Sequence, residues 1–221
     1  MRGRRGFGLP DGSALRCYLL CGAAMDLLFF AIYYSMQWLS ARRSDVHHVY
    51  FNWELSVPLV PWMIVIYLSM FILFIVPLFK VSASEMKTLF KQIACATLLA
   101  GLIFLLFPSV SGFHRYVPAG YFAPYFKFLY QIDMAPYNAF PSLHVIYSSL
   151  ILMSLRDMSN GYEKYLYMLW LILIVLSTIF VHQHHLADII GGLAVVWICR
   201  MSLPHDDVRE EGIRNSREVE N

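Results

Sequence analysis

Residues 181–192 read VHQHHLADIIGG, which places three histidines and an aspartate between two long apolar runs. Ionisable side chains are costly inside a bilayer, so they are rare there and mark functional sites where they occur. Each flanking run has close to the length that a membrane helix needs. The stretch therefore predicts two membrane helices that meet at a polar, functional junction.

The composition of the whole chain indicates the same class of protein. Of the 221 residues, 58% are hydrophobic and 14% are charged, whereas a soluble domain is nearer half apolar and a quarter charged. We therefore expect an all-α, polytopic membrane protein whose six transmembrane helices form one bundle. The expected spans are residues 15–39, 57–79, 91–108, 141–156, 165–182 and 185–201.

The basic residues orient these spans. Lysine and arginine accumulate on the cytoplasmic side of membrane proteins, and with the N-terminus inside, 13 of the 17 fall on that side. The chain then divides into a cytoplasmic segment at 1–14, a membrane domain at 15–201 and a polar cytoplasmic tail at 202–221. The junction at 181–192 is expected on the outer, periplasmic or lumenal face.

Charge and cysteine usage argue against other classes of protein. The net charge is only +2, and no basic stripe alternates with aromatic residues, so nucleic acid is not an expected partner. The four cysteines lie in apolar runs without metal-ligand spacing, which is typical of buried hydrophobic residues. The three histidines of the junction would point in different directions on a helix, so no metal is expected there. The sequence does not define an oligomeric state.

The junction itself carries a candidate catalytic pair. His184 and Asp188 are four residues apart, so on a helix they would share a face. The carboxylate could then hold one imidazole N–H while the other ring nitrogen acts as a nucleophile or base. Gly191 and Gly192 follow on the same helix and would let a neighbouring helix approach closely.

A second candidate group opens the fourth apolar run, in the sequence NAFPSLH at 138–144. Pro141 suits the first turn of a helix, where its missing N–H costs nothing. A helix N-terminus beside the Ser142 hydroxyl suits a phosphate group. His144 could give a proton to a leaving oxygen.

These motifs resemble those of the type 2 phosphatidic acid phosphatase superfamily, whose signatures are K-x6-R-P, P-S-x-H and S-R-x5-H-x3-D. The second and third signatures are recognisable, and the resemblance covers roughly residues 57–200. The matching residues are Pro141, Ser142 and His144 for the second signature, and Ser177, His184 and Asp188 for the third. The resemblance implies a six-helix membrane core and chemistry on a lipid phosphate or phospholipid.

The resemblance also implies a role for each matching side chain. His184 would attack phosphorus and form a phosphohistidine, and Asp188 would orient it. His144 would protonate the leaving group, and Ser142 would bind phosphate oxygens. Family members of this kind need neither a metal nor another cofactor.

The departures from the signatures concern positive charge. Pro108 stands at the lysine position of the first signature, Tyr116 follows Arg115 where proline is expected, and Thr178 replaces the arginine of the third. Arg115 is therefore the one motif cation expected to bind phosphate. The candidates to supply the remaining charge are His114, Lys127, His182 and His185.

These departures leave three functions open. The leading prediction is a metal-independent lipid-phosphate phosphatase or phosphotransferase, which acts on a lipid-linked phosphoester or pyrophosphate at the outer face of the membrane. The altered signatures are also similar to those of inositol phosphorylceramide synthases and related bacterial proteins, which transfer phosphorylated head groups between lipids. A transporter or scaffold that kept the helical core is the third possibility, although such a protein need not retain the catalytic residues.

Further residues have less specific predictions. Asn138 is expected to order the loop before the fourth span, with Ser177 and His185 as supporting site residues. Asp26 lies inside the first span, as a functional group or as a hydrogen-bond partner of another helix. Residues 121–133 are expected to form a short interfacial helix over the active site.

Overall fold

The computed structural model describes residues 9–133 and 135–204 and has an all-α fold. The helices are α1 (Gly12–Ser40), the 3-10 helix η1 (Asn52–Ser56), α2 (Met63–Leu68), α3 (Met70–Leu73), α4 (Val76–Lys80), α5 (Ala83–Leu106), α6 (Ala123–Ile132), α7 (Leu143–Met158), α8 (Glu163–Phe180) and α9 (Leu186–Ser202). Two short strands, β1 (His47–His48) and β2 (Ser109–Val110), pair in parallel. Most of the predicted N-terminal segment (1–8) and tail (205–221) lies outside the described residues.

Three of the described helices, α1, α5 and α8, are long and apolar enough to cross a membrane. Helices α7 and α9 are shorter, with 16 and 17 residues. Each predicted apolar run contains helix, and the membrane-length helices agree with the predicted class of protein. The number of crossings stays a prediction.

The second predicted span is not one continuous helix. Residues 57–79 instead contain the short helices α2 and α3 and most of α4, with breaks near Ser69 and Ile75. Pro77 has no N–H to donate to the carbonyl group four residues earlier, so a continuous helix is unfavourable there. Ser69 accepts a hydrogen bond from Trp170 Nε1 at 2.9 Å, which fixes the first break against α8.

Two helix starts also differ from the prediction. Helix α5 begins at Ala83 instead of residue 91, because Ser82 and Glu85 form a capping box in which Glu85 Oε2 accepts the Ser82 N–H at 3.0 Å. Helix α7 begins after Ser142, which is its N-cap residue. Pro141 therefore precedes the helix and does not lie in its first turn, as had been expected.

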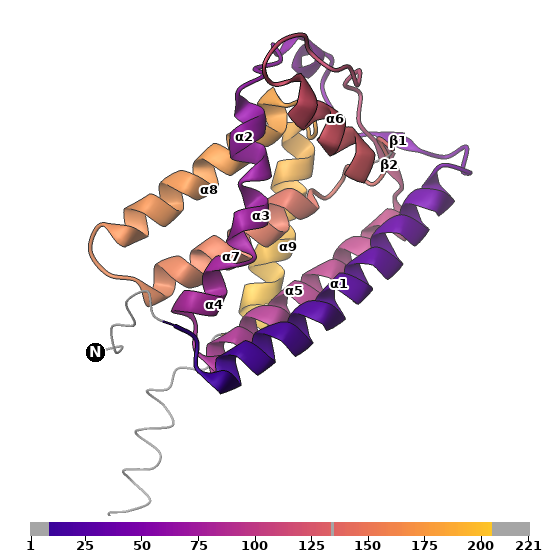
Figure 1. The fold of residues 1–221 in the computed structure, drawn as a ribbon. Coiled ribbons are helices and arrows are strands. Elements are labelled where there is room, and N and C mark those ends of the chain that lie inside the picture. The colour runs from indigo at the N-terminus through magenta and orange to yellow at the C-terminus, as the bar shows by residue number, and fades with distance from the viewer. Residues whose placement is uncertain (1–8, 134, 205–221) are drawn as a thin grey trace, which may run out of the picture.

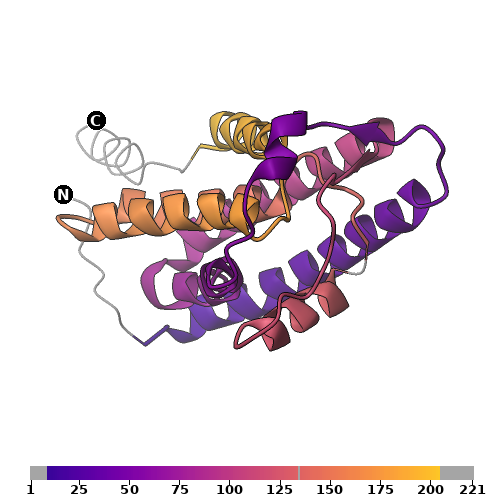
Figure 2. The same ribbon diagram turned by 90° about the horizontal axis from the view of Figure 1, so that it is seen from above.

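Helix α7 lies at the centre of the bundle and positions the site. It packs against α3, α5, α8 and α9, and its Ile146, Leu150 and Ile151 side chains are buried. Helix α1 runs alongside α5 (Figure 1). Seen from above, α1 and α6 border one side of the molecule and α9 lies on the other (Figure 2). The N-terminal ends of α7 and α9 meet, and the N–H of Ser142, the N-cap residue of α7, donates to the Asp188 carbonyl group of α9 at 3.0 Å.

Candidate active site

His184 was predicted to lie on a helix, but it lies in the short connection between α8 and α9. The Thr178 carbonyl group accepts the N–H groups of Gln183 and His184, at 2.9 and 3.1 Å, and folds the connection back onto α8. Asp188 is the third residue of α9, and its Oδ2 lies 3.4 Å from His184 Nδ1. The same oxygen accepts the His185 N–H at 2.9 Å. The predicted pair is thus formed, with the carboxylate held by the helix start.

His144 continues this pair into a row of four side chains. Its Nδ1 lies 3.4 Å from His184 Nε2, the nitrogen that does not face Asp188. On its other side, the Tyr67 hydroxyl lies 2.5 Å from His144 Nε2. Tyr67, His144, His184 and Asp188 are called the histidine row below. Sequence reasoning missed Tyr67, because it stands in an apolar run with no motif around it.

The loop before α7 is joined to the start of α9. Ser142 is fully buried; its Oγ accepts the Val145 N–H at 3.3 Å, and its own N–H donates to the Asp188 carbonyl group at 3.0 Å. Its hydroxyl therefore caps α7, while its predicted role in phosphate binding stays a prediction. Ser177 is also buried and donates to the Ile174 carbonyl group of its own helix at 2.6 Å.

Two glycines of α9 make this contact possible. A Cβ atom on Gly192 would lie 3.0 Å from the Ser142 carbonyl oxygen, and one on Gly191 would lie 2.5 Å from the Phe140 ring. The predicted close approach at Gly191 and Gly192 is confirmed. It holds His144 and His184 on facing segments.

Asn138 connects the same loop to α1. It has a φ of 59°, a conformation that asparagine tolerates better than most residues. Its Nδ2 donates to the Tyr33 carbonyl group and its Oδ1 accepts from Ser40 Oγ, both at 3.2 Å. The loop is thereby anchored to the end of α1.

Arg115 is held by protein acceptors. Its Nη2 lies 2.5 Å from Asp133 Oδ2 and 3.0 Å from the Ala135 carbonyl oxygen. The Tyr33 hydroxyl donates to the other Asp133 oxygen at 2.8 Å. Burial raises the pKa of Tyr130, whose neutral ring faces the guanidinium group. Arg115, Tyr130 and Asp133 are called the arginine cluster below; within it, the positive charge is balanced by a carboxylate.

The other candidate cations contribute no side chain to the wall of the cavity described below. His114 and Lys127 are exposed and do not line the cavity described below. His182 and His185, in the connection between α8 and α9, stack on opposite sides of the Phe113 ring, with centroids 4.3 and 4.2 Å away. Burial lowers the pKa of both histidines, which favours their neutral forms. The structure therefore offers no replacement at these four positions for the missing motif charges.

Sequence reasoning also missed Glu54, which lies in η1, between α1 and α2, and supports the connection that carries His184. Glu54 is 1% exposed, and its Oε2 accepts the Leu186 N–H at 2.8 Å and lies 3.3 Å from His185 Nδ1. The Gly112 N–H donates to the other His185 ring nitrogen at 3.1 Å. Three loops thus converge around His185, and no local motif in the sequence signals it.

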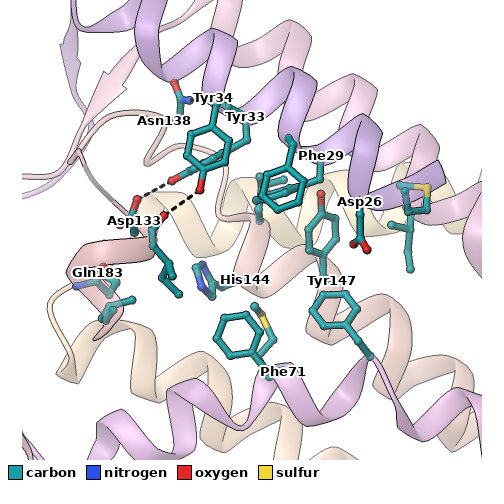
Figure 3. Close-up of a pocket in the computed structure, with 18 of the residues that line it drawn as sticks. Asp26, Phe29, Tyr33, Tyr34, Phe71, Asp133, Asn138, His144, Tyr147 and Gln183 are labelled. Carbon is teal, nitrogen blue, oxygen red and sulfur yellow. Dashed lines mark hydrogen bonds between the residues drawn. The ribbon is translucent and has the colours of Figure 1, made fainter. Parts of the chain in front are cut away.

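A mostly apolar cavity of about 740 Å³ opens beside the histidine row. Its lining comes mainly from α1, α3, α5, α6, α7 and the loop before α7, and includes His144, His184 and Arg115. Figure 3 shows His144, Asp133 and Gln183 toward one end and Asp26 and Tyr147 toward the other. Helix α6 lies within the predicted segment 121–133 and contributes to the wall. The site thus combines an acid–base row with room for a large apolar molecule.

Metal-ligand geometry is not found in this part of the chain. Among residues 9–133 and 135–204, no group of three or more histidine, cysteine, aspartate or glutamate side chains gathers as a ligand set. His182 is turned away from His184, and its Nε2 lies 2.9 Å from the Val57 carbonyl oxygen.

Comparison with known proteins identifies the family to which this chain belongs. No curated protein and no solved structure gives a match to the chain. The family described as the PAP2 superfamily matches residues 45–201, which include the histidine row, the arginine cluster and, apart from α1, nearly all of the bundle. That range is well over half of the chain, so this protein belongs to the PAP2 superfamily.

Proposed function

We propose that this protein is a lipid-phosphate phosphatase or phosphotransferase that works through a phosphohistidine on His184. Membership of a superfamily of phosphatases and phosphotransferases supports this class of activity. The observation that carries the proposal is the contact of His184 with Asp188 and His144 beside an apolar cavity. A lipid could place its phosphate at the histidines and its hydrocarbon part in the cavity.

The proposed reaction has two steps. His184 Nε2 attacks phosphorus, a P–N bond forms and a P–O bond breaks, while His144 donates a proton to the leaving oxygen. Asp188 accepts the hydrogen bond from Nδ1–H of His184 and stabilises the positive charge on that ring. In the second step His144 takes a proton from water or an alcohol, which attacks phosphorus and releases His184.

The experiment is phosphate release from a panel of lipid phosphates by the purified protein in detergent, with chelator present. Release that persists with chelator and disappears in His184→Ala supports the proposal. Release by the variant at the wild-type rate contradicts the assignment of the nucleophile. If the folded wild type releases no phosphate, hydrolysis is rejected and donor and acceptor lipids are supplied together.

A head-group transferase is the second candidate, and the charge of the site favours it. The motif positions that carry cations in the family hold Pro108 and Thr178, and Arg115 is paired with Asp133. A phosphomonoester carries up to two negative charges, whereas a phosphodiester carries one, so a site with little net positive charge suits a diester donor. Mass spectrometry of products formed from a phospholipid donor and a lipid alcohol distinguishes transfer from hydrolysis.

We further propose six membrane crossings, with α2–α4 together forming the second, both termini cytoplasmic and the histidine row at the outer face. The bias of basic residues supports this orientation. The exposed residues His114 and Tyr162 lie in connections predicted on opposite sides. In intact cells, an impermeant thiol reagent should label His114→Cys, but should label Tyr162→Cys only after permeabilisation. Labelling in the reverse order contradicts the topology.

A further inference from the structure

The apolar half of the cavity holds one carboxyl group that the proposed reaction does not use. Asp26 lies in the middle of α1, on the face that lines the cavity together with Gly22 and Phe29. Figure 3 shows its carboxyl group pointing into the cavity, near Tyr147. Within the described ranges, no side chain or backbone group forms a hydrogen bond with it.

The neighbouring polar groups of this half already have partners. The Tyr18 hydroxyl donates to a backbone carbonyl group at 3.1 Å, and the Tyr147 hydroxyl lies 2.8 Å from that of Thr97. Arg115, the basic residue that lines the cavity, is paired within the arginine cluster at the other end. Asp26 itself is exposed, so a polar group of the molecule that fills the cavity can reach its carboxylate.

The position of Asp26 defines where that partner would lie. Asp26 and Tyr33 are seven residues apart on α1, which corresponds to about 10 Å along the helix. Tyr33 donates to Asp133 and thus marks the end of the cavity near the arginine cluster. A lipid with its phosphate at His184 would therefore pass Asp26 with its hydrophobic part.

When an apolar molecule fills the cavity and displaces water from Asp26, the carboxylate loses hydrogen bonds unless that molecule supplies a donor. A plain hydrocarbon chain offers none, whereas a hydroxyl or an amide N–H does. We propose that Asp26 is a specificity-determining residue, which selects lipid substrates with a hydroxyl or amide N–H in their hydrophobic part, roughly 10 Å from the phosphate-binding end. This inference rests on the proposed function, since it requires a phosphorylated lipid in the cavity.

Lipid binding by the inactive His184→Ala protein tests the inference without turnover. The protein in detergent is given equal amounts of two phosphatidic acids, one with plain chains and one with a hydroxyl partway along one chain. Native mass spectrometry measures which lipid is bound. The hydroxylated lipid should be preferred on the order of three- to tenfold, the value of one hydrogen bond.

Two substitutions in the same background assign the preference to Asp26. Asp26→Leu should bind both lipids equally, and its apolar side chain suits a membrane helix, so folding is not at risk. Asp26→Asn should keep part of the preference, because its amide oxygen still accepts. Equal binding before substitution, an unchanged preference after Asp26→Leu, or no binding of either lipid would overturn the inference.

Phosphate release from the same lipids by wild type tests the proposed function separately. Selective binding without turnover supports the Asp26 inference and rejects hydrolysis.

Discussion

The histidine row and the arginine cluster both face the cavity, but they are held in different ways. The His184 N–H donates to the Thr178 carbonyl group of α8, and the Asp188 carboxylate accepts the His185 N–H at the start of α9. The Ser142 N–H ties that helix start to the loop before α7. Arg115 is held instead through its side chain, by the ion pair with Asp133 and by a hydrogen bond to the Ala135 carbonyl group. Attack on phosphorus requires one geometry of the histidines, whereas the charge beside them can vary with the charge of the substrate.

The largest expected effect is loss of the nucleophile. His184→Ala should lower kcat roughly 10⁴-fold or more in phosphate release or head-group transfer, because the proposed P–N bond forms on the His184 ring, which Asp188 orients. His114→Ala is the matched control, since His114 is exposed and lies outside the cavity. It should stay within about twofold of wild type. An equal loss of kcat in His184→Ala and His114→Ala would contradict the assignment of His184 as the nucleophile.

The arginine cluster should show a smaller, charge-dependent effect. Arg115→Gln removes a fixed cation and should lower turnover about 10²-fold. Asp133→Asn leaves Arg115 unpaired and keeps an acceptor for Tyr33, so the site becomes more positive. It should raise the rate on phosphomonoesters relative to phosphodiesters by roughly tenfold. The ratio of kcat/KM values on the two substrates is the measurement; a ratio unchanged by Asp133→Asn would show that the pair does not set charge preference.

The third prediction concerns the contact between the Tyr67 hydroxyl and the His144 ring. Tyr67→Phe removes the hydroxyl beside His144 Nε2 and should lower kcat about tenfold with KM unchanged, the effect of one hydrogen bond to a reacting group. Tyr147→Phe is the control, because Tyr147 lines the same cavity but bonds Thr97. A rise in KM with constant kcat in Tyr67→Phe would assign Tyr67 to lipid binding instead.

The sequence predicts those parts of the site that depend on local spacing. The pairing of His184 with Asp188 and the close contact of Gly191 and Gly192 follow from positions a few residues apart, and both are present. Even there the local conformation differed, since His184 precedes the helix. Ser82 and Glu85 have the spacing of a capping box and could have predicted that α5 starts at Ala83. The predicted start at residue 91 followed instead from the length of the apolar run.

The parts that depend on long-range contacts were not predictable. Tyr67 meets His144 across 77 positions of sequence, and Glu54 meets Leu186 across 132. A tyrosine in an apolar run and a glutamate in a loop have many possible partners, so neither residue type nor spacing selects one. The pairing of Arg115 with Asp133, which are 18 positions apart, was missed for the same reason.

The smallest expected effect concerns the contact that holds the two halves of the row together. Gly191→Ala places a methyl group against the Phe140 ring, and overpacking of this kind costs about 1–3 kcal/mol. Better helix propensity offsets up to about 1 kcal/mol of that cost. Gly22→Ala on α1 has the same propensity gain, and its new methyl group meets no atom within 4 Å. Thermal unfolding in detergent should therefore show a lower Tm for Gly191→Ala and an equal or higher Tm for Gly22→Ala.

Because Phe140 lies in the loop before His144, Gly191→Ala should also lower kcat several-fold. A variant with reduced Tm but full activity would mean that the row keeps its geometry without this contact, and that the ion-paired side of the cavity does more to position the substrate.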